Sequence, residues 1–305
     1  MMLSDAGSKQ TCDHGSAILG GRKKMEYDPN KIKIHVLHCG TVHLQENLTY
    51  LAKGVSKKRV QLPVSAYLVE HPVHGNLLIE AGLSADCRAL FSPHLNWFYD
   101  PHVEKGQTAV EQLADMGLKP EDIDLLLITH NDADHTCAIQ DFAGRAKRIV
   151  MPELEYFYSS RSVFRVRQSW KTYIPYEGLI ERPFYYGTPL GPACRGFDLV
   201  QDDSVLCLLA PGHTEGQMMV MLNKAPSARF TEAGAGNYGG PYVIFAADAA
   251  ISHRNIDDLV VPGFGFNRHL QREALKWLKE MKADPDCKAI FCSHDPDIQP
   301  QTIEI

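Results

Sequence analysis

Apolar residues after position 30 either alternate with polar residues or form short unbroken runs. The alternation in "KIKIHVLHCG" (31–40) predicts a strand with one face in the core. Two strand-like segments, "VSAYLVEH" (64–71) and "GNLLIEAG" (75–82), are joined by "PVHG", which predicts a hairpin. The run "DLLLITH" (124–130) is apolar without alternation, which is typical of a strand buried on both faces.

Segments with helical spacing lie among these strands. Residues 108–118 repeat apolar positions at helical intervals, and Gly117 is placed to end that helix. Residues 270–281 predict an amphipathic helix with Leu270 and Leu278 on its apolar face. Further strands are predicted over 204–213, 216–223, 242–248 and 288–295. The strands therefore come in two batches, each mixed with helices, which indicates an α/β fold.

The domain organisation follows from where this pattern begins. Residues 1–30 are polar, contain Gly and Ser and lack periodicity, so we expect a flexible N-terminal tail. No linker or low-complexity segment interrupts the pattern after residue 30. Residues 31–305 are therefore predicted to form a single domain.

Composition and charge exclude several classes of protein. The net charge of −6 is spread along the chain, so we expect no nucleic-acid partner. The apolar runs are too short to cross a bilayer, and residues 1–30 contain no signal-peptide segment, so we expect no membrane partner. The eight cysteines are scattered without metal-ligand or redox spacing, which favours reduced, mostly buried thiols in a cytoplasmic protein.

The candidate chemistry lies where predicted strands end. Four strands end in a histidine or an aspartate: "LLLITH" in His130, "LCLLAPGH" in His213, "VIFAAD" in Asp248 and "AIFCSH" in His294. The loop after His130 adds three more residues of ligand type, Asp132, Asp134 and His135. Strand ends present side chains to a shared cleft. Seven donors suffice for two metal ions, and one carboxylate such as Asp248 can bridge both.

Each of these residues also has an ordinary structural interpretation. Asp132 or Asp134 is equally placed to cap the following helix. His213 suits a turn, Asp248 a strand end, and His294 a core histidine bonded to backbone. The occurrence of four such strand ends in one chain nevertheless favours the metal interpretation over chance.

Cys137 and the remaining histidines have no metal-ligand residue near them in the sequence at a spacing typical of a metal or catalytic site. Cys137 follows His135 closely, but a buried and inert thiol is the better interpretation. We expect surface or hydrogen-bonded structural roles for the remaining histidines that lie in the predicted fold. These are His35, His38, His43, His71, His74, His94, His102 and His269.

The segments "LITHNDADHT", "APGHTEGQ", "FAAD" and "FCSHD" resemble the ligand motifs of the metallo-β-lactamase superfamily. Within it the chain looks most like the acyl-homoserine lactonase branch, over about residues 33–298. The resemblance implies an αββα sandwich, in which two mixed β-sheets are flanked by helices. It also implies a metal-dependent hydrolase that opens a small-molecule lactone or ester with a hydroxide bound to two metals.

The resemblance further implies how the ligands are shared. One divalent ion would be held by His130, Asp132, His213 and Asp248. The other would be held by Asp134, His135, Asp248 and His294. The family's role for Asp134 is to position the bridging water and to pass a proton to the leaving group. The metals would be zinc by resemblance.

One departure from the family pattern affects the metal. The family's loop usually has a second histidine where this chain has Asp132. A carboxylate is a harder ligand, which makes iron or manganese possible. The flavodiiron branch also has a carboxylate there, so a di-iron oxidoreductase lacking its flavodoxin domain is one alternative. A non-catalytic member of the fold is another.

A second departure affects the substrate. Lactonases of this family usually have a tyrosine three residues after the bridging aspartate, where this chain has Ile251. Tyr185, Tyr186 and His253 are candidates to replace its hydroxyl. The aromatic-rich segment 161–187 suits either the wall of a partly apolar substrate pocket or ordinary packing.

Overall fold

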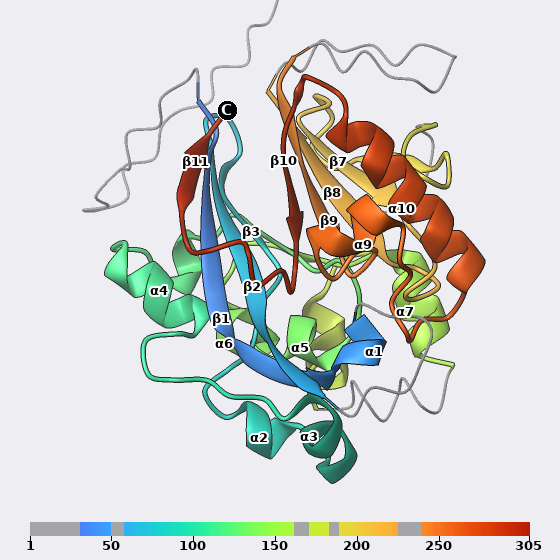
Figure 1. The fold of residues 1–305 in the computed structure, drawn as a ribbon. Coiled ribbons are helices and arrows are strands. Elements are labelled where there is room, and N and C mark those ends of the chain that lie inside the picture. The colour runs from blue at the N-terminus through green and yellow to red at the C-terminus, as the bar shows by residue number, and fades with distance from the viewer. Residues whose placement is uncertain (1–30, 50–57, 162–170, 183–188, 225–239) are drawn as a thin grey trace, which may run out of the picture.

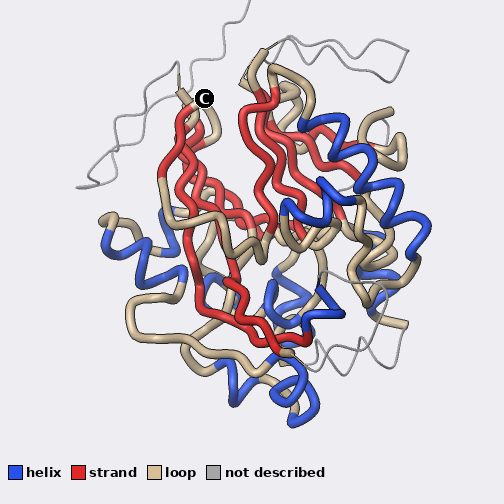
Figure 2. Tube along the Cα trace, viewed as in Figure 1, coloured by secondary structure: helices blue, strands red, loops and turns tan. Residues whose placement is uncertain are grey.

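The computed structural model describes residues 31–49, 58–161, 171–182, 189–224 and 240–305. Two β-sheets lie face to face, and helices cover their outer sides and one end of the sandwich (Figures 1 and 2). The predicted αββα sandwich is therefore confirmed. The predicted flexible tail, residues 1–30, lies outside the described residues, and the single-domain interpretation of residues 31–305 stays a prediction.

The first sheet contains six strands in the order β11-β1-β2-β3-β4-β5. The antiparallel β2–β3 hairpin pairs His71 with Gly75, as the sequence predicted. From β3 onward the pairing is parallel, and β4 is fully buried. The strands are β1 (Lys33–Gln45), β2 (Arg59–His71), β3 (Gly75–Ile79), β4 (Leu125–Leu127), β5 (Ile149–Val150) and β11 (Thr302–Glu304).

The second sheet contains five strands in the order β10-β9-β8-β7-β6. Only β9 and β10 pair in parallel; the remaining neighbours are antiparallel. Strands β6 and β11 were not predicted, because three residues are too few to show a periodicity. The strands are β6 (Gly196–Asp198), β7 (Val205–Leu209), β8 (Met218–Asn223), β9 (Tyr242–Ala247) and β10 (Cys287–Cys292).

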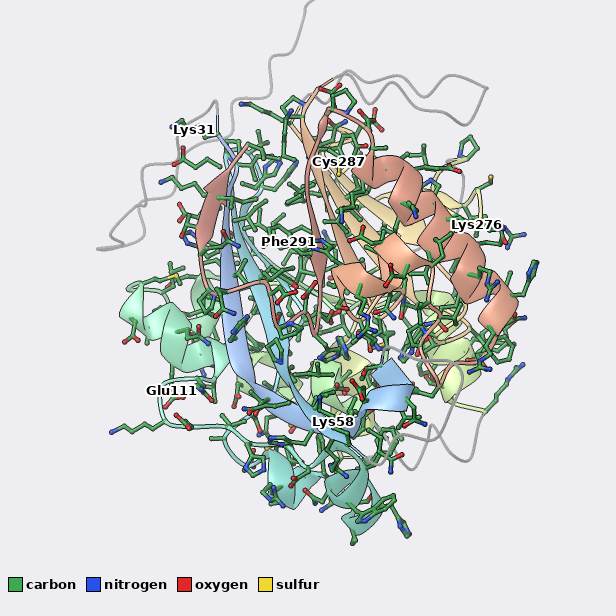
Figure 3. All side chains as sticks on the ribbon, viewed as in Figure 1. Lys31, Lys58, Glu111, Lys276, Cys287 and Phe291 are labelled. Atoms are coloured by element: carbon green, nitrogen blue, oxygen red, sulfur yellow. The ribbon has the colours of Figure 1, made fainter. Side chains whose placement is uncertain are left out.

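Three aromatic side chains join the two sheets at the centre of the core. Tyr67 of β2 contacts Phe245 of β9 and Phe291 of β10, with ring centroids 4.8 and 5.3 Å apart. Figure 3 labels Phe291 between the sheets. Aromatic side chains bury large areas and dominate core energetics, so these contacts hold the sheets in a fixed relation.

The helices are mostly short and capped by their own sequence. Thr108 and Glu111 form a capping box at the start of α4, with both side chain–backbone bonds at 3.2 Å. The helices are α1 (Glu46–Thr49), α2 (Cys87–Leu90), α3 (Pro93–Tyr99), α4 (Ala109–Asp115), α5 (Ala133–Thr136), α6 (Ile139–Phe142), α7 (Glu153–Ser159), α9 (His253–Asp258) and α10 (Arg268–Lys282). Two 3-10 helices are η1 (Pro120–Asp122) and η2 (Ile174–Leu179).

The long helix α10 covers the outer face of the second sheet (Figure 1). Its buried face is turned slightly from the predicted one. Leu278 is buried as expected, but Leu270 is 36% exposed and the neighbouring Gln271 is buried instead. The backbone of Gln271 lies directly against Gly212.

Candidate metal centre

Four strands deliver the predicted donors to one end of the sandwich. His130 follows β4 of the first sheet, whereas His213, Asp248 and His294 follow β7, β9 and β10 of the second. The short helix α5, which carries Asp134 and His135, lies at this lower end (Figure 1). All seven predicted donor residues are buried, including Asp132.

The segment after β4 explains how one loop contributes four donors. Asp132 stands at the N-cap position of α5 with extended backbone, φ −82° and ψ 152°. Its side chain makes no capping hydrogen bond. Instead, Asp132 Oδ2 lies 3.1 Å from His213 Nε2. The helix-cap interpretation of Asp132 is therefore wrong, and its carboxylate faces the cluster.

The donors fall into two compact groups. His130, Asp132 and His213 form the first group, and Asp134, His135 and His294 form the second. Within each group the three donor atoms lie within 4.8 Å of one another. Distances of this size suit donors arranged around one ion.

Asp248 stands between the groups. Its Oδ1 lies 3.3 Å from both His135 Nε2 and His294 Nε2, and its Oδ2 lies 3.6 Å from His213 Nε2. One oxygen therefore faces each group. The preceding residue, Ala247, has a φ of +48°, and the β9–β10 register shifts opposite it. A non-glycine residue in this region is strained, and such strain is often found at functional sites.

Each group contains a buried polar atom without a hydrogen-bond partner among the described residues. In the first group these atoms include His130 Nε2, and in the second they include Asp134 Oδ1. Leaving one such atom unpaired costs about 1–3 kcal/mol. A cation in each group would satisfy these atoms, so the residues fit the metals that the sequence predicts.

The electrostatics favour the ligand form of two residues in particular. Burial, and then the neighbouring His135, hold the pKa of His130 well below its usual value, which keeps the imidazole neutral. Burial alone would raise the pKa of Asp248, but His294 and His135 lower it well below its usual value. A neutral imidazole and an ionised carboxylate are the forms that bind metal.

The remote ring nitrogens of His294 and His130 are hydrogen-bonded, and that of His135 lies close to a carboxylate. His294 Nδ1 donates to the Pro63 carbonyl at 2.8 Å. His130 Nδ1 lies 2.9 Å from Thr129 Oγ1, and His135 Nδ1 lies 3.2 Å from Glu80 Oε1. In metal sites such contacts fix the orientation and tautomer of a ligand ring. Each Nε2 is thereby directed toward the cluster.

Glu80 is one functional residue that the sequence reasoning missed. It is buried, has a φ of +67°, and accepts a hydrogen bond from the Thr129 hydroxyl as well as contacting His135. The sequence does point to Glu80, because the apolar segment "NLLIE" ends in an acid in the same way as the four strands that end in a donor.

Of the residues considered as substitutes for the family's tyrosine, His253 alone is described, and its ring is engaged elsewhere. Ile251 is fully buried in an apolar cluster with Val42 and Leu62. The His253 ring is already bonded through Nε2 to the Ile290 carbonyl at 2.8 Å. Tyr185 and Tyr186 lie outside the described residues.

Cys137 is buried, and burial raises its pKa to about 12, which confirms the inert thiol. Among the other histidines, His71 accepts hydrogen bonds from two backbone amides of its own hairpin, and His35 contacts Thr302 and Glu70. These are structural roles, as predicted.

No described helix is long and apolar enough to cross a membrane. A buried His/Asp cluster at the ends of strands from two facing mixed sheets is typical of a metallohydrolase. Consistent with this class, the family model of the metallo-beta-lactamase superfamily matches residues 59–223, and the chain belongs to that superfamily.

Known relatives cover most of the chain at low identity. N-acyl homoserine lactonase AttM of Agrobacterium fabrum is 21% identical over 276 residues, which are 87% of this chain and 94% of the relative. A probable metallo-hydrolase of Mycobacterium tuberculosis is 26% identical over 291 residues, covering 88% and 81% of the two chains. A solved N-acyl homoserine lactone hydrolase, with N-hexanoyl-L-homoserine at its catalytic metal center, is 21% identical with a TM-score of 0.66, covering 87% and 94%.

Proposed function

We propose that this protein is a metal-dependent hydrolase that opens the ester bond of a lactone or a related small ester. The observation that carries the proposal is the pair of three-donor groups with Asp248 between them. The lactonase relatives support the substrate class. The predicted partner is accordingly a small molecule, and the cytoplasmic location stays a prediction.

The residues would hold two divalent ions. We assign His130, Asp132 and His213 to the first ion, and Asp134, His135 and His294 to the second, with Asp248 shared. When bound, such a pair of metals lowers the pKa of a shared water toward neutrality and polarises a substrate carbonyl. Imidazole suits zinc, whereas the Asp132 carboxylate also suits iron or manganese.

Asp134 is the residue we assign to proton transfer. Its Oδ2 lies 3.5 Å from His294 Nε2, whereas its Oδ1 has no hydrogen-bond partner in the described chain. Burial raises the pKa of Asp134 above its usual value. A carboxylate with one oxygen free of hydrogen bonds can accept a proton at that oxygen and deliver it to a leaving alkoxide.

The surroundings support a partly apolar substrate. The Phe264 ring lies 5.2 Å from the His213 ring and 5.9 Å from Phe98 of α3, measured between centroids. These aromatic residues were not among the predicted pocket residues. Of the predicted wall, residues 161–187, residues 162–170 and 183–187 lie outside the described residues. In the described part, Tyr173 and Ile180 pack in a hydrophobic core cluster, as the packing alternative expects.

With Ile251 in the core, the centre lacks the hydroxyl that this position supplies in the lactonases the chain resembles. Losing one contact to the developing oxyanion lowers kcat by about 10²–10³-fold in other hydrolases. We therefore expect lactone hydrolysis to be slow but measurable.

The Asp132 carboxylate beside His213 also supports an alternative, a di-iron oxidoreductase. The two functions differ in what they consume. A hydrolase uses water and needs no electrons, whereas a di-iron reductase consumes oxygen when it is reduced. A non-catalytic member of the fold would do neither.

The test is metal analysis followed by a panel of lactones and esters, each assayed with and without a chelator. Wild-type protein purified without added metal should hold two ions, and Asp248→Ala should lose most of both because it is shared. Asp115→Ala is the matched control, since Asp115 is exposed at the end of α4.

Chelation should abolish hydrolysis, and added metal should restore it. One ion or none in wild-type protein would contradict the two-metal assignment. Oxygen consumption by reduced protein, without chelator-sensitive hydrolysis of any lactone or ester, would favour the oxidoreductase.

A further inference from the structure

Helix α7 contacts the metal centre through a buried glutamate. Glu155 Oε1 accepts a hydrogen bond from the Asn131 amide at 3.1 Å. Its Oε2 accepts from the Thr214 hydroxyl at 2.6 Å and from the Gly216 amide at 3.2 Å. One turn further along α7, Ser159 Oγ accepts from Asn131 Nδ2 at 3.1 Å. A single helix face therefore binds two separate loops.

Both loops carry donors of the first group. Asn131 stands between His130 and Asp132, and Thr214 follows His213 directly. The second group has other supports, because His294 is bonded to the Pro63 carbonyl and His135 contacts Glu80. The two halves of the centre are thus held by different parts of the chain.

The contact at Gly216 is too close for any other residue. A Cβ atom on Gly216 would lie 2.0 Å from the backbone nitrogen of Glu155 and 2.4 Å from its Cα. Because backbone cannot yield at such distances, only glycine lets this loop bring its amide to the Glu155 carboxylate.

We propose that Glu155 is a positioning residue for the first metal ion, an inference that rests on the metal centre of the proposed function. A carboxylate is an acceptor at both oxygens, and here each oxygen serves a different loop. Fixing both loops on α7 fixes the separation of His130 and Asp132 from His213. Losing that link should let the first group open while the second stays formed.

Glu155→Gln tests this with little change in shape. A glutamine has one acceptor oxygen and one amide nitrogen that only donates, so it can hold one loop but not the other. Glu153→Gln is the matched control, because Glu153 lies in the same helix and is exposed. The measurement is titration of the apoprotein with zinc by calorimetry, with bound metal confirmed by elemental analysis.

We expect Glu155→Gln to bind one zinc as tightly as wild type and the other about 10–100-fold more weakly, as for other residues that orient metal ligands. A merely structural role would lower stability without separating the two affinities. Double variants identify the weakened site. Adding His213→Ala should remove the weakened ion and leave the tight one, whereas adding His294→Ala should remove the tight ion.

The inference is overturned if Glu155→Gln binds two ions as wild type does, if both affinities fall equally, or if wild type binds no zinc. If Glu155→Gln does not fold, Ser159→Ala is the second variant. It removes the Asn131 side-chain bond and a bond from Ser159 Oγ to the Tyr156 carbonyl in the same helix, and it should weaken the same ion more mildly. Unchanged affinity there also overturns the inference. Wild type that binds two ions but hydrolyses no ester refutes the proposed function, and the zinc titrations still decide the role of Glu155.

Discussion

Replacing Ile251 by tyrosine should destabilise the protein and should not raise its lactonase activity. From sequence alone this substitution looks like the restoration of a catalytic hydroxyl. In the structure, however, the Ile251 side chain is fully buried in an apolar cluster that includes Val42, Leu62 and Cys137. A tyrosine there would enter the core and bring its hydroxyl into apolar surroundings.

The expected loss has two parts. Forcing a larger side chain into a packed core costs about 1–3 kcal/mol. Burying a hydroxyl without a hydrogen-bond partner costs about 1–3 kcal/mol more. Ile251→Tyr should therefore lower the free energy of unfolding by about 2–6 kcal/mol, which is a large fraction of typical stability. Ile251→Val, which removes one methyl group, should cost only about 0.5–1.5 kcal/mol.

The assay is chemical denaturation of wild type and both variants as apoproteins, followed by lactone turnover of the metal-loaded forms. We expect wild type to be the most stable, Ile251→Val to be less stable and Ile251→Tyr to be the least stable. We expect no gain in lactone turnover for Ile251→Tyr. If Ile251→Tyr were as stable as wild type and hydrolysed lactones faster, the side chain at this position would face the metals, and its assignment to the core would be wrong.

Three further predictions concern other residues. Asp132→His should shift metal preference toward zinc, measured by elemental analysis after growth in mixed metals, because imidazole replaces a hard oxygen ligand; an unchanged profile would exclude Asp132 as a ligand. Burial, and then His74, lower the pKa of His71 to about 4, so the unfolded state binds more protons between pH 4 and 6.5, and stability falls as the pH drops through that window. His71→Asn keeps a hydrogen-bond acceptor and should reduce the loss in apoprotein stability from pH 7 to pH 5 by about 1–2 kcal/mol. An equal loss of stability in both proteins would contradict this. Among the described cysteines, exposed Cys194 should react first with iodoacetamide, and rapid native labelling of Cys137 would contradict its burial.

The sequence was sufficient for the longer strands and for singling out the candidate donors. Alternating or continuous apolar runs marked β1, β2, β4, β7, β9 and β10, because their side chains fill the core between and outside the sheets. His130, His213, Asp248 and His294 stood out because each interrupts an apolar run where a strand ends. Short elements such as β6 and β11 were missed, since their positions depend on pairing with distant strands.

Which atoms face one another was decided only by tertiary structure. The sequence left Asp132 open between a helix cap and a ligand, and packing against His213 from another strand placed it in the cluster. It suggested a catalytic position for residue 251, which the fold fills with core packing. The contacts of Glu80 and Glu155 could not be predicted, because their partners come from segments far along the chain. Local spacing specifies elements and residue types, whereas the contacts of a buried polar side chain depend on how those elements pack.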